Sequence, residues 1–241
     1  MFFVQNDSLD AAFHFSVEEY FIRYARKSER IFMLWQTDKT VMIGNNQLYK
    51  AEADYDFAEK AGINLVRRSS GGGAIYTDRG TVLYTFIEPV SSDIKTHREN
   101  TAAEIIDALG KIGASAVREG KNDILLDGKK ISGLAQYTSA DHVCTHGSLL
   151  YDTGLDILTR VLTPAKTKLQ SKGIASVRSR VTNIRPYLKT DYSTNEFINK
   201  LKELITGKTN CENYILNNSE LKKIGLIYNE KYGNKEWNYR I

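Results

Sequence analysis

The sequence predicts an α+β fold with a mixed, mainly antiparallel sheet flanked by helices. Three observations support this prediction. Strand-like runs arrive as neighbours or hairpins, and helical segments stand between groups of strands rather than after each strand. The glycine run at residues 71–73 fits neither the dinucleotide-binding fingerprint nor the P-loop, so a Rossmann-type parallel sheet is not favoured.

The first part of the chain predicts one helix and two strands. Polar residues 6–8 can cap a helix over residues 11–26, in which apolar side chains recur at helical spacing. Residues 31–36 and 40–43 are apolar and strand-like. The polar residues 37–39 between them predict a turn.

The next part surrounds the glycine run. Residues 51–60 predict a short helix that ends near Gly62. Residues 64–68 are strand-like and lead into the glycines. Residues 81–87 alternate well enough to predict another strand after them. The glycine run is therefore expected to connect two strands.

The middle of the chain predicts a helix and a hairpin. Apolar residues share one face of a helix over 98–112, and Gly113 provides its stop. Residues 123–126 and 130–137 are strand-like, and the Asp127-Gly128 pair between them is typical of a tight hairpin turn.

The last part predicts one strand, one irregular segment and two helices. Residues 142–151 continue the strands. Residues 166–185 are rich in Lys, Arg and Ser, which predicts a mobile loop with short helical turns. Ser193 or Thr194 can cap a helix that runs to Ile205, and residues 220–232 predict a final helix.

Composition excludes several classes of protein. The net charge of +4 is mildly basic, which suits an anionic ligand but is too weak to indicate nucleic-acid binding. No apolar run approaches membrane-spanning length, and no signal-peptide pattern is present. Two cysteines, Cys144 and Cys211, give no disulfide framework, and the four histidines lack zinc-ligand spacing. A reducing cytoplasm is therefore expected.

The run RRSSGGGAIYTD at residues 67–78 is the first candidate site. Consecutive glycines allow the backbone to approach a ligand with its N–H groups turned towards an anion. Arg67 and Arg68 would supply fork-shaped donors for a carboxylate or phosphate. The alternative is a flexible turn between strands with solvated arginines.

The hairpin carries the second candidate site. Lys130 stands at the base of a strand, and the small residues Ser132 and Gly133 leave room for a ligand against the sheet. Asn122 and Asp123 could orient a magnesium ion or a ribose. The alternative is that Lys130 only improves solubility. The third candidate, residues 168–183, is by itself a basic, serine-rich loop that is either solvated or binds phosphates.

Together these segments resemble the lipoate–protein ligase family. The resemblance rests on four motifs in order: RSSGGGAIY at 68–76, KISGLA at 130–135, HGSLL at 146–150 and KGIASVRSRVTN at 172–183. The C-terminal residues 231–232 and 236–239 extend it over nearly the whole chain. The resemblance implies the biotin/lipoate protein ligase catalytic-domain fold.

The resemblance also implies an acyl-adenylate mechanism with ATP and Mg²⁺ and no tightly bound cofactor. Lipoate would be activated to lipoyl-AMP, and the lipoyl group would pass to a carrier lysine. Lys130 would be the catalytic cation, and Asp123 would bind Mg²⁺. The expected ATP and adenylate residues are Ser69, Gly73, Ala74, Ile75, Tyr76, Asn122, Asp123, Lys130, Arg178 and Asn183. The expected lipoate residues are Arg68, Gly71, Gly72, Lys130, Ser132, Gly133 and His146.

The same resemblance gives expectations about organisation and partners. Residues 1–241 would form a single catalytic domain, without the smaller C-terminal domain that many members carry, so a separate accessory domain is a possible partner. The carrier would be a lipoyl domain of a 2-oxoacid dehydrogenase E2 or a glycine-cleavage H protein. Nucleic acid and membrane are not expected partners.

Four alternatives remain open. An acyltransferase of the same fold would move octanoyl or lipoyl groups through a cysteine thioester, for which Cys144 is the candidate. A second alternative is that the chain only transfers preformed lipoyl-AMP. A biotin ligase fits the lysine and loop motifs less well. The last alternative is a module that binds a carrier or an adenylate without catalysis.

Overall fold

The computed structural model describes residues 1–25, 28–90, 93–162, 180–207 and 209–240. Its larger sheet contains β1 (Phe2–Val4), β2 (Ile31–Trp35), β6 (Thr81–Pro89), β7 (Val117–Glu119), β8 (Asp123–Leu126), β9 (Lys129–Thr138), β10 (His142–Leu150) and β11 (Glu212–Tyr214). The strand order is β11-β1-β2-β6-β10-β9-β8-β7. β1 is parallel to β11 and β2, and the remaining pairs are antiparallel.

A smaller sheet stands beside it with the order β4-β3-β5. The central strand β3 (Thr40–Ile43) is parallel to β4 (Asn64–Arg67) and antiparallel to β5 (Ile75–Thr77). The glycine run therefore connects the two outer strands of this small sheet. The predicted mixed, mainly antiparallel α+β architecture is confirmed.

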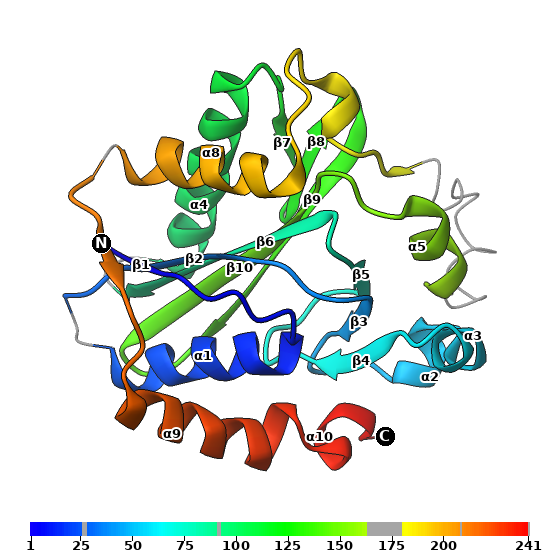
Figure 1. Cartoon of the computed structure of the whole chain (residues 1–241), viewed down its shortest axis with the longest axis vertical. Coiled ribbons are helices and arrows are strands. Elements are labelled where there is room, and N and C mark those ends of the chain that lie inside the picture. Colours follow the sequence, from blue (N-terminus) through cyan, green and yellow to red (C-terminus); the bar gives the residue numbers. More distant parts are fainter. Residues whose placement is uncertain (26–27, 91–92, 163–179, 208, 241) are drawn as a thin grey trace.

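Helices cover both faces of the larger sheet (Figure 1). The described helices are α1 (Ala11–Tyr24), α2 (Tyr49–Glu52), α3 (Tyr55–Lys60), α4 (Ile94–Lys111), α5 (Leu155–Val161), α8 (Thr194–Thr206), α9 (Asn218–Ile227) and α10 (Lys235–Tyr239). α4 and α8 pack on one face, and α1 and α9 pack on the other (Figure 1). No helix in the described ranges is both long and apolar enough to cross a membrane.

Alternation along β2 shows how the sequence fills both layers. Phe32 and Leu34 belong to the core under α4 and α8, whereas Met33 and Trp35 belong to the core under α1 and α9. Successive side chains of a strand point to opposite faces, so an entirely apolar strand is what a sheet covered on both sides requires.

Most predicted elements are confirmed, with shifted ends. Asp127 and Gly128 have positive φ angles of 51° and 69°, as a type I′ hairpin turn requires. Ser193 caps α8 through a capping box with Glu196. The helix predicted from residue 98 begins earlier, at Ile94. The helix predicted over 220–232 consists of α9 followed by a π-helical turn, Tyr228–Tyr232.

Two expectations need correction. The polar segment 37–39 is a bend between two sheets, so β2 and β3 do not pair. The helix predicted over 51–60 is two short helices, because Asp54 caps α3 and interrupts the segment. Sequence reasoning also missed short elements, namely β1, β7, β11, α5 and α10. The predicted loop 166–185 falls mostly on residues 163–179, outside the described residues.

Candidate functional site

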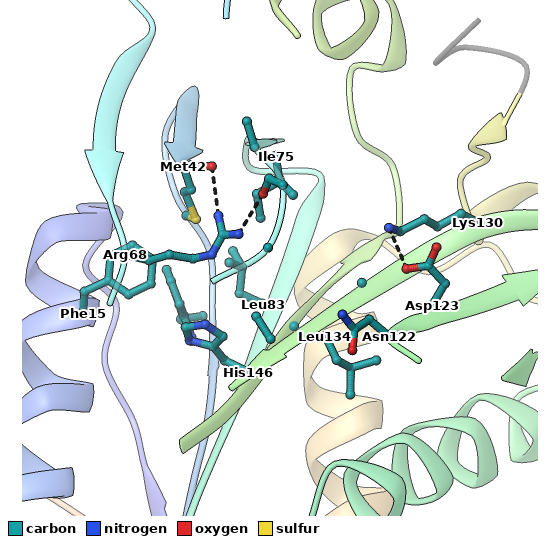
Figure 2. Close-up of a pocket in the computed structure, with 17 residues that line it drawn as sticks. Phe15, Met42, Arg68, Ile75, Leu83, Asn122, Asp123, Lys130, Leu134 and His146 are labelled. Carbon is teal, nitrogen blue, oxygen red and sulfur yellow. Dashed lines mark hydrogen bonds and ion pairs between the residues drawn. The ribbon is translucent and has the colours of Figure 1, made fainter. Parts of the chain in front are cut away.

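Two cavities meet at Lys130. The inner cavity has a volume of about 260 Å³, and its apolar walls come from Phe15, Trp35, Met42, Leu83 and Leu134. The outer cavity has a volume of about 510 Å³. Both are lined by the same six residues, Gly73, Ala74, Ile75, Asp123, Lys130 and Gly133. Lys130 and Asp123 lie at one end of the inner cavity, away from Arg68, His146 and Phe15 (Figure 2).

The hairpin β8–β9 positions Lys130 at this junction. Its Nζ lies 2.8 Å from Oδ1 of Asp123, and both side chains are partly exposed. A register shift pairs Ile124 with Ser132 but Leu125 with Lys130, and such bulges re-aim side chains. A Cβ on Gly133 would lie 3.1 Å from Nζ, so the glycine leaves room for the ammonium group to cross the strand. Lys130 is thus a paired but accessible cation.

The chain that follows the undescribed segment is hydrogen-bonded to the backbone of Lys130. The N–H of Thr182 donates to the carbonyl oxygen of Lys130 at 3.1 Å, and Val181 forms a parallel bridge with Lys130. Arg180 and Val181 line the outer cavity. Part of the predicted adenylate loop is therefore beside the lysine. Arg178 lies outside the described residues.

Adjacent arginines in the glycine motif have different roles. Arg67 is buried and lines neither cavity. Its guanidinium donates to six backbone carbonyl oxygens, those of Gly44, Asn45, Gln47, Trp237, Asn238 and Arg240. The expectation that Arg67 offers its donors to an anionic ligand is therefore wrong, because the fold itself occupies them.

Arg68 lines the inner cavity and holds the glycine loop. Its Nη2 donates to the carbonyl oxygens of Gly71 at 2.9 Å and Gly73 at 2.7 Å, and its Nη1 donates to that of Met42 at 3.0 Å. Burial lowers the pKa of the guanidinium to about 10, partly offset by the carboxylate of Glu18. Arg68 therefore remains a cation at neutral pH. Gly72 has a φ of +96°, a conformation that favours glycine.

His146, on β10, lines the inner cavity. Its Nε2 lies 2.6 Å from Oγ of Ser70, and its Nδ1 lies 2.9 Å from Oε2 of Glu18. Glu18 is fully buried and also accepts a hydrogen bond from Thr85 at 2.6 Å. Sequence reasoning missed Glu18. The available signal was a pair of acidic residues, 18–19, within a mainly apolar helix.

Cys144 is not placed to act as a nucleophile. Its side chain is fully buried and lines neither cavity. Burial, together with the nearby charge of Glu18, raises the pKa of its thiol well above the ordinary value. A thioester mechanism needs an accessible thiolate, so the acyltransferase alternative is disfavoured. The potential metal-binding atoms of Glu18, Cys144 and His146 lie within 4.8 Å of one another. Glu18 and His146 are, however, already hydrogen-bonded to each other.

The remaining predicted residues divide between the cavities and the scaffold. Tyr76 and Ser132 line the outer cavity, and Asn122, Gly72 and Gly73 line the inner one. Ser69 and Gly71 line neither cavity; the hydroxyl of Ser69 lies 2.7 Å from that of Tyr232. The Asn183 side chain accepts a hydrogen bond from the backbone N–H of Thr153 and donates one to its carbonyl oxygen. In this structure Asn183 therefore connects two segments of the chain.

Proteins similar in sequence to this chain include lipoate-protein ligases. The chain is 36% identical over 230 residues to a probable lipoate-protein ligase A of Mycoplasma pneumoniae, covering 94% of this chain and 68% of that protein. It is 34% identical to the lipoate-protein ligase LplJ of Bacillus subtilis, covering 99% of this chain and 73% of the relative.

A solved structure of a bi-partite lipoate protein ligase from Thermoplasma acidophilum, described with its E2 lipoyl domain, has a similar fold. The TM-score is 0.87 at 25% identity, and the match covers 98% of this chain and 95% of that one. The family model of the lipoyl protein ligase A/B catalytic domain matches residues 10–206. The chain therefore belongs to the lipoyl protein ligase A/B catalytic domain family.

Proposed function

We propose that this chain is a lipoate–protein ligase that activates lipoate with ATP and transfers the lipoyl group to a lysine of a carrier protein. The observation that carries the proposal is the position of Lys130 where a small apolar cavity meets a larger one. The reaction joins an apolar acid to an anionic nucleotide, so it needs one cation within reach of both.

The inner cavity suits the acyl acid. Its walls of Phe15, Trp35, Met42 and Leu83 match an aliphatic chain that ends in a dithiolane ring. With the ring at the end beside Phe15 and His146, the carboxylate points to Lys130 (Figure 2). The outer cavity then accommodates ATP, with its α-phosphate close to the same ammonium group.

In the first step a lipoate carboxylate oxygen attacks the α-phosphorus of ATP, and pyrophosphate leaves. Lys130 reduces the repulsion between the two anions and stabilises the charge on the phosphoryl oxygens. In the second step the amine of the carrier lysine attacks the acyl carbonyl. AMP leaves, and the amine loses a proton as the amide forms.

Asp123 is the residue that we propose for Mg²⁺. Mg²⁺ is typically held by one or two carboxylates together with substrate phosphates, and Asp123 lines both cavities. The ion would neutralise phosphate charge. In the structure Asp123 forms an ion pair with the ammonium group of Lys130 at 2.8 Å. Binding of Mg²⁺ to the Asp123 carboxylate would therefore release Lys130 towards the substrates.

The proposed carrier is the lipoyl domain of a 2-oxoacid dehydrogenase E2 or a glycine-cleavage H protein. The similar Thermoplasma ligase, described with its E2 lipoyl domain, supports the first of these. Both cysteines are free, which suits a reducing cytoplasm as the working compartment.

The test is the intact mass of a purified E2 lipoyl domain after incubation with this chain. One reaction contains lipoate, ATP and Mg²⁺, and another contains preformed lipoyl-AMP. We expect one lipoyl group to be added in both, and none on a carrier whose target lysine is replaced by arginine.

Each other outcome points to one alternative. Labelling only from lipoyl-AMP would limit the chain to the transfer step. Labelling from an octanoylated carrier without ATP would favour the acyltransferase. No labelling of either an E2 domain or an H protein would overturn the proposal.

A further inference from the structure

Two adjacent glutamates of α1 are connected to two adjacent serines of the glycine motif by hydrogen bonds. In each connection, one side chain stands between the glutamate and the serine. Glu18 contacts Nδ1 of His146 at 2.9 Å, and Nε2 of His146 lies 2.6 Å from Oγ of Ser70. Glu19 accepts a hydrogen bond from the hydroxyl of Tyr232 at 2.6 Å, and that hydroxyl lies 2.7 Å from Oγ of Ser69. We call these the His146 relay and the Tyr232 relay.

The hydrogen bonds of the His146 relay have one consistent direction. In the Nδ1–H tautomer of His146, the Glu18 carboxylate accepts hydrogen bonds from both Thr85 and Nδ1. Nε2 is then an acceptor for the Ser70 hydroxyl, and Ser70 Oγ accepts from Nε of Arg68 at 3.1 Å. The relay thus links Arg68 to Glu18 through Ser70 and His146, and all four side chains are buried.

This connection determines how Arg68 is oriented. With Nε fixed by Ser70, the remaining donors of Arg68 bind the carbonyls of Met42, Gly71 and Gly73. Gly73 lines both cavities beside Lys130. The shape of the glycine loop along the inner cavity therefore depends on a carboxylate that lines neither cavity.

We propose that Glu18 is a positioning residue for the acyl acid: through His146 and Ser70 it sets Arg68 and the glycine wall of the inner cavity. The inference rests on the proposed function. Loss of the Glu18 charge removes the group that selects the Nδ1–H tautomer of His146. Ser70 then loses its acceptor, and Arg68 loses the contact that fixes its rotation.

The Tyr232 relay is the natural comparison, because it has similar chemistry but does not reach the cavities. Glu19, Tyr232 and Ser69 line neither of them. Although burial raises the pKa of the Glu19 carboxyl, hydrogen bonds from Lys231 and Tyr232 outweigh this and lower it below its ordinary value. This relay fastens the C-terminal segment to the glycine motif, and none of its three residues lines the inner cavity.

The test compares Glu18→Gln with Glu19→Gln, two changes that each remove one charge and keep side-chain size. We expect Glu18→Gln to weaken lipoate binding, measured by calorimetry, by about tenfold or more, because hydrogen bonds to charged groups are lost. The KM for ATP should change less than about twofold. Glu19→Gln should leave lipoate affinity within about twofold and lower Tm.

Nitrogen NMR provides a second readout, which general destabilisation would not produce. We expect His146 to be the Nδ1–H tautomer in the wild-type chain and a mixture in Glu18→Gln. If Glu18→Gln does not fold, Ser70→Ala breaks the same relay with a smaller change and should weaken lipoate binding similarly.

The outcomes separate the two proposals. If the wild-type chain binds no lipoate, the proposed function fails. If the wild type binds lipoate and the folded Glu18 or Ser70 variant binds it equally well, the positioning role is wrong while the ligase function stands. Equal losses of lipoate affinity in Glu18→Gln and Glu19→Gln would also overturn the positioning role of Glu18.

Discussion

The inner and outer cavities are built from different kinds of structure. Phe15, Trp35 and Met42 wall the inner cavity and also belong to the buried core under α1. The outer cavity combines strand residues such as Ser132 and Leu150 with exposed positions at the hairpin turn and at a segment end, namely Gly128 and Arg180. The shape of the inner cavity is therefore determined by core packing, which resists adjustment. Selectivity for the acid should depend on the fold more strongly than selectivity for the nucleotide.

The largest expected effect is at Lys130, which belongs to both cavities. Lys130→Ala should slow lipoyl-AMP formation by about 100- to 1,000-fold, the range found for losing one preorganised transition-state donor. Pyrophosphate release would measure this step. Lys129→Ala, its exposed neighbour on β9, is the matched control. Comparable activity in both variants would show that Lys130 is only a surface lysine.

The wall of the inner cavity should also make stability depend on pH. His14 stacks on Trp35 with ring centroids 4.5 Å apart, and burial lowers its pKa from 6.5 to about 4. Between these values the unfolded chain binds a proton that the native chain does not. The free energy of unfolding should therefore fall as the pH falls from 6.5 to 4, by about 3 kcal/mol in total.

Denaturant unfolding at several pH values would measure this contribution. His14→Phe keeps a ring against Trp35 but cannot titrate, so the loss between pH 6.5 and 4 should shrink by the same amount. An unchanged pH dependence in His14→Phe would assign the effect to other groups.

Two leucines of the hairpin allow a matched test of the two cavities. Leu134 lines only the inner cavity, and Leu125 lines only the outer one. Leu134→Ala should raise the KM for lipoate about fivefold and leave that for ATP unchanged, because about 1 kcal/mol of apolar contact is lost. Leu125→Ala should do the reverse. If each variant shifted both KM values equally, the division of substrates between the cavities would be wrong.

The smallest effect is expected at the rim of the outer cavity. Arg180 is exposed there, and its side chain can approach phosphates without being desolvated. Arg180→Ala should raise the KM for ATP about two- to fivefold at low salt, and the difference should diminish at high ionic strength. An effect on the KM for lipoate alone would contradict this placement.

Local signals predicted the parts of the molecule that local chemistry determines. Asp127-Gly128 specified its hairpin because only a few residue types accept two successive positive φ angles. The capped helix after Ser193 follows the same logic. Lys130 could be proposed from the sequence because its motif lies within one hairpin and resembles that of a known family.

The roles of Arg67 and Glu18 could not be predicted in this way. The Nε of Arg67 donates to the carbonyl of Trp237, 170 positions away, and Glu18 contacts His146, 128 positions away. Nothing near Arg67 in the sequence distinguishes it from Arg68. Strands of three residues, such as β1 and β7, are too short to show periodicity. These features depend on tertiary packing.

The hydrogen bond from Thr182 to the carbonyl of Lys130 provides a means of observing the site without a substrate. The amide proton of Thr182 exchanges with solvent only when this bond opens. Its protection therefore measures how firmly the chain at 181–182 is docked on β9 at the proposed catalytic lysine. A change in its exchange rate on adding lipoate, ATP or a carrier domain would show which of them tightens that attachment.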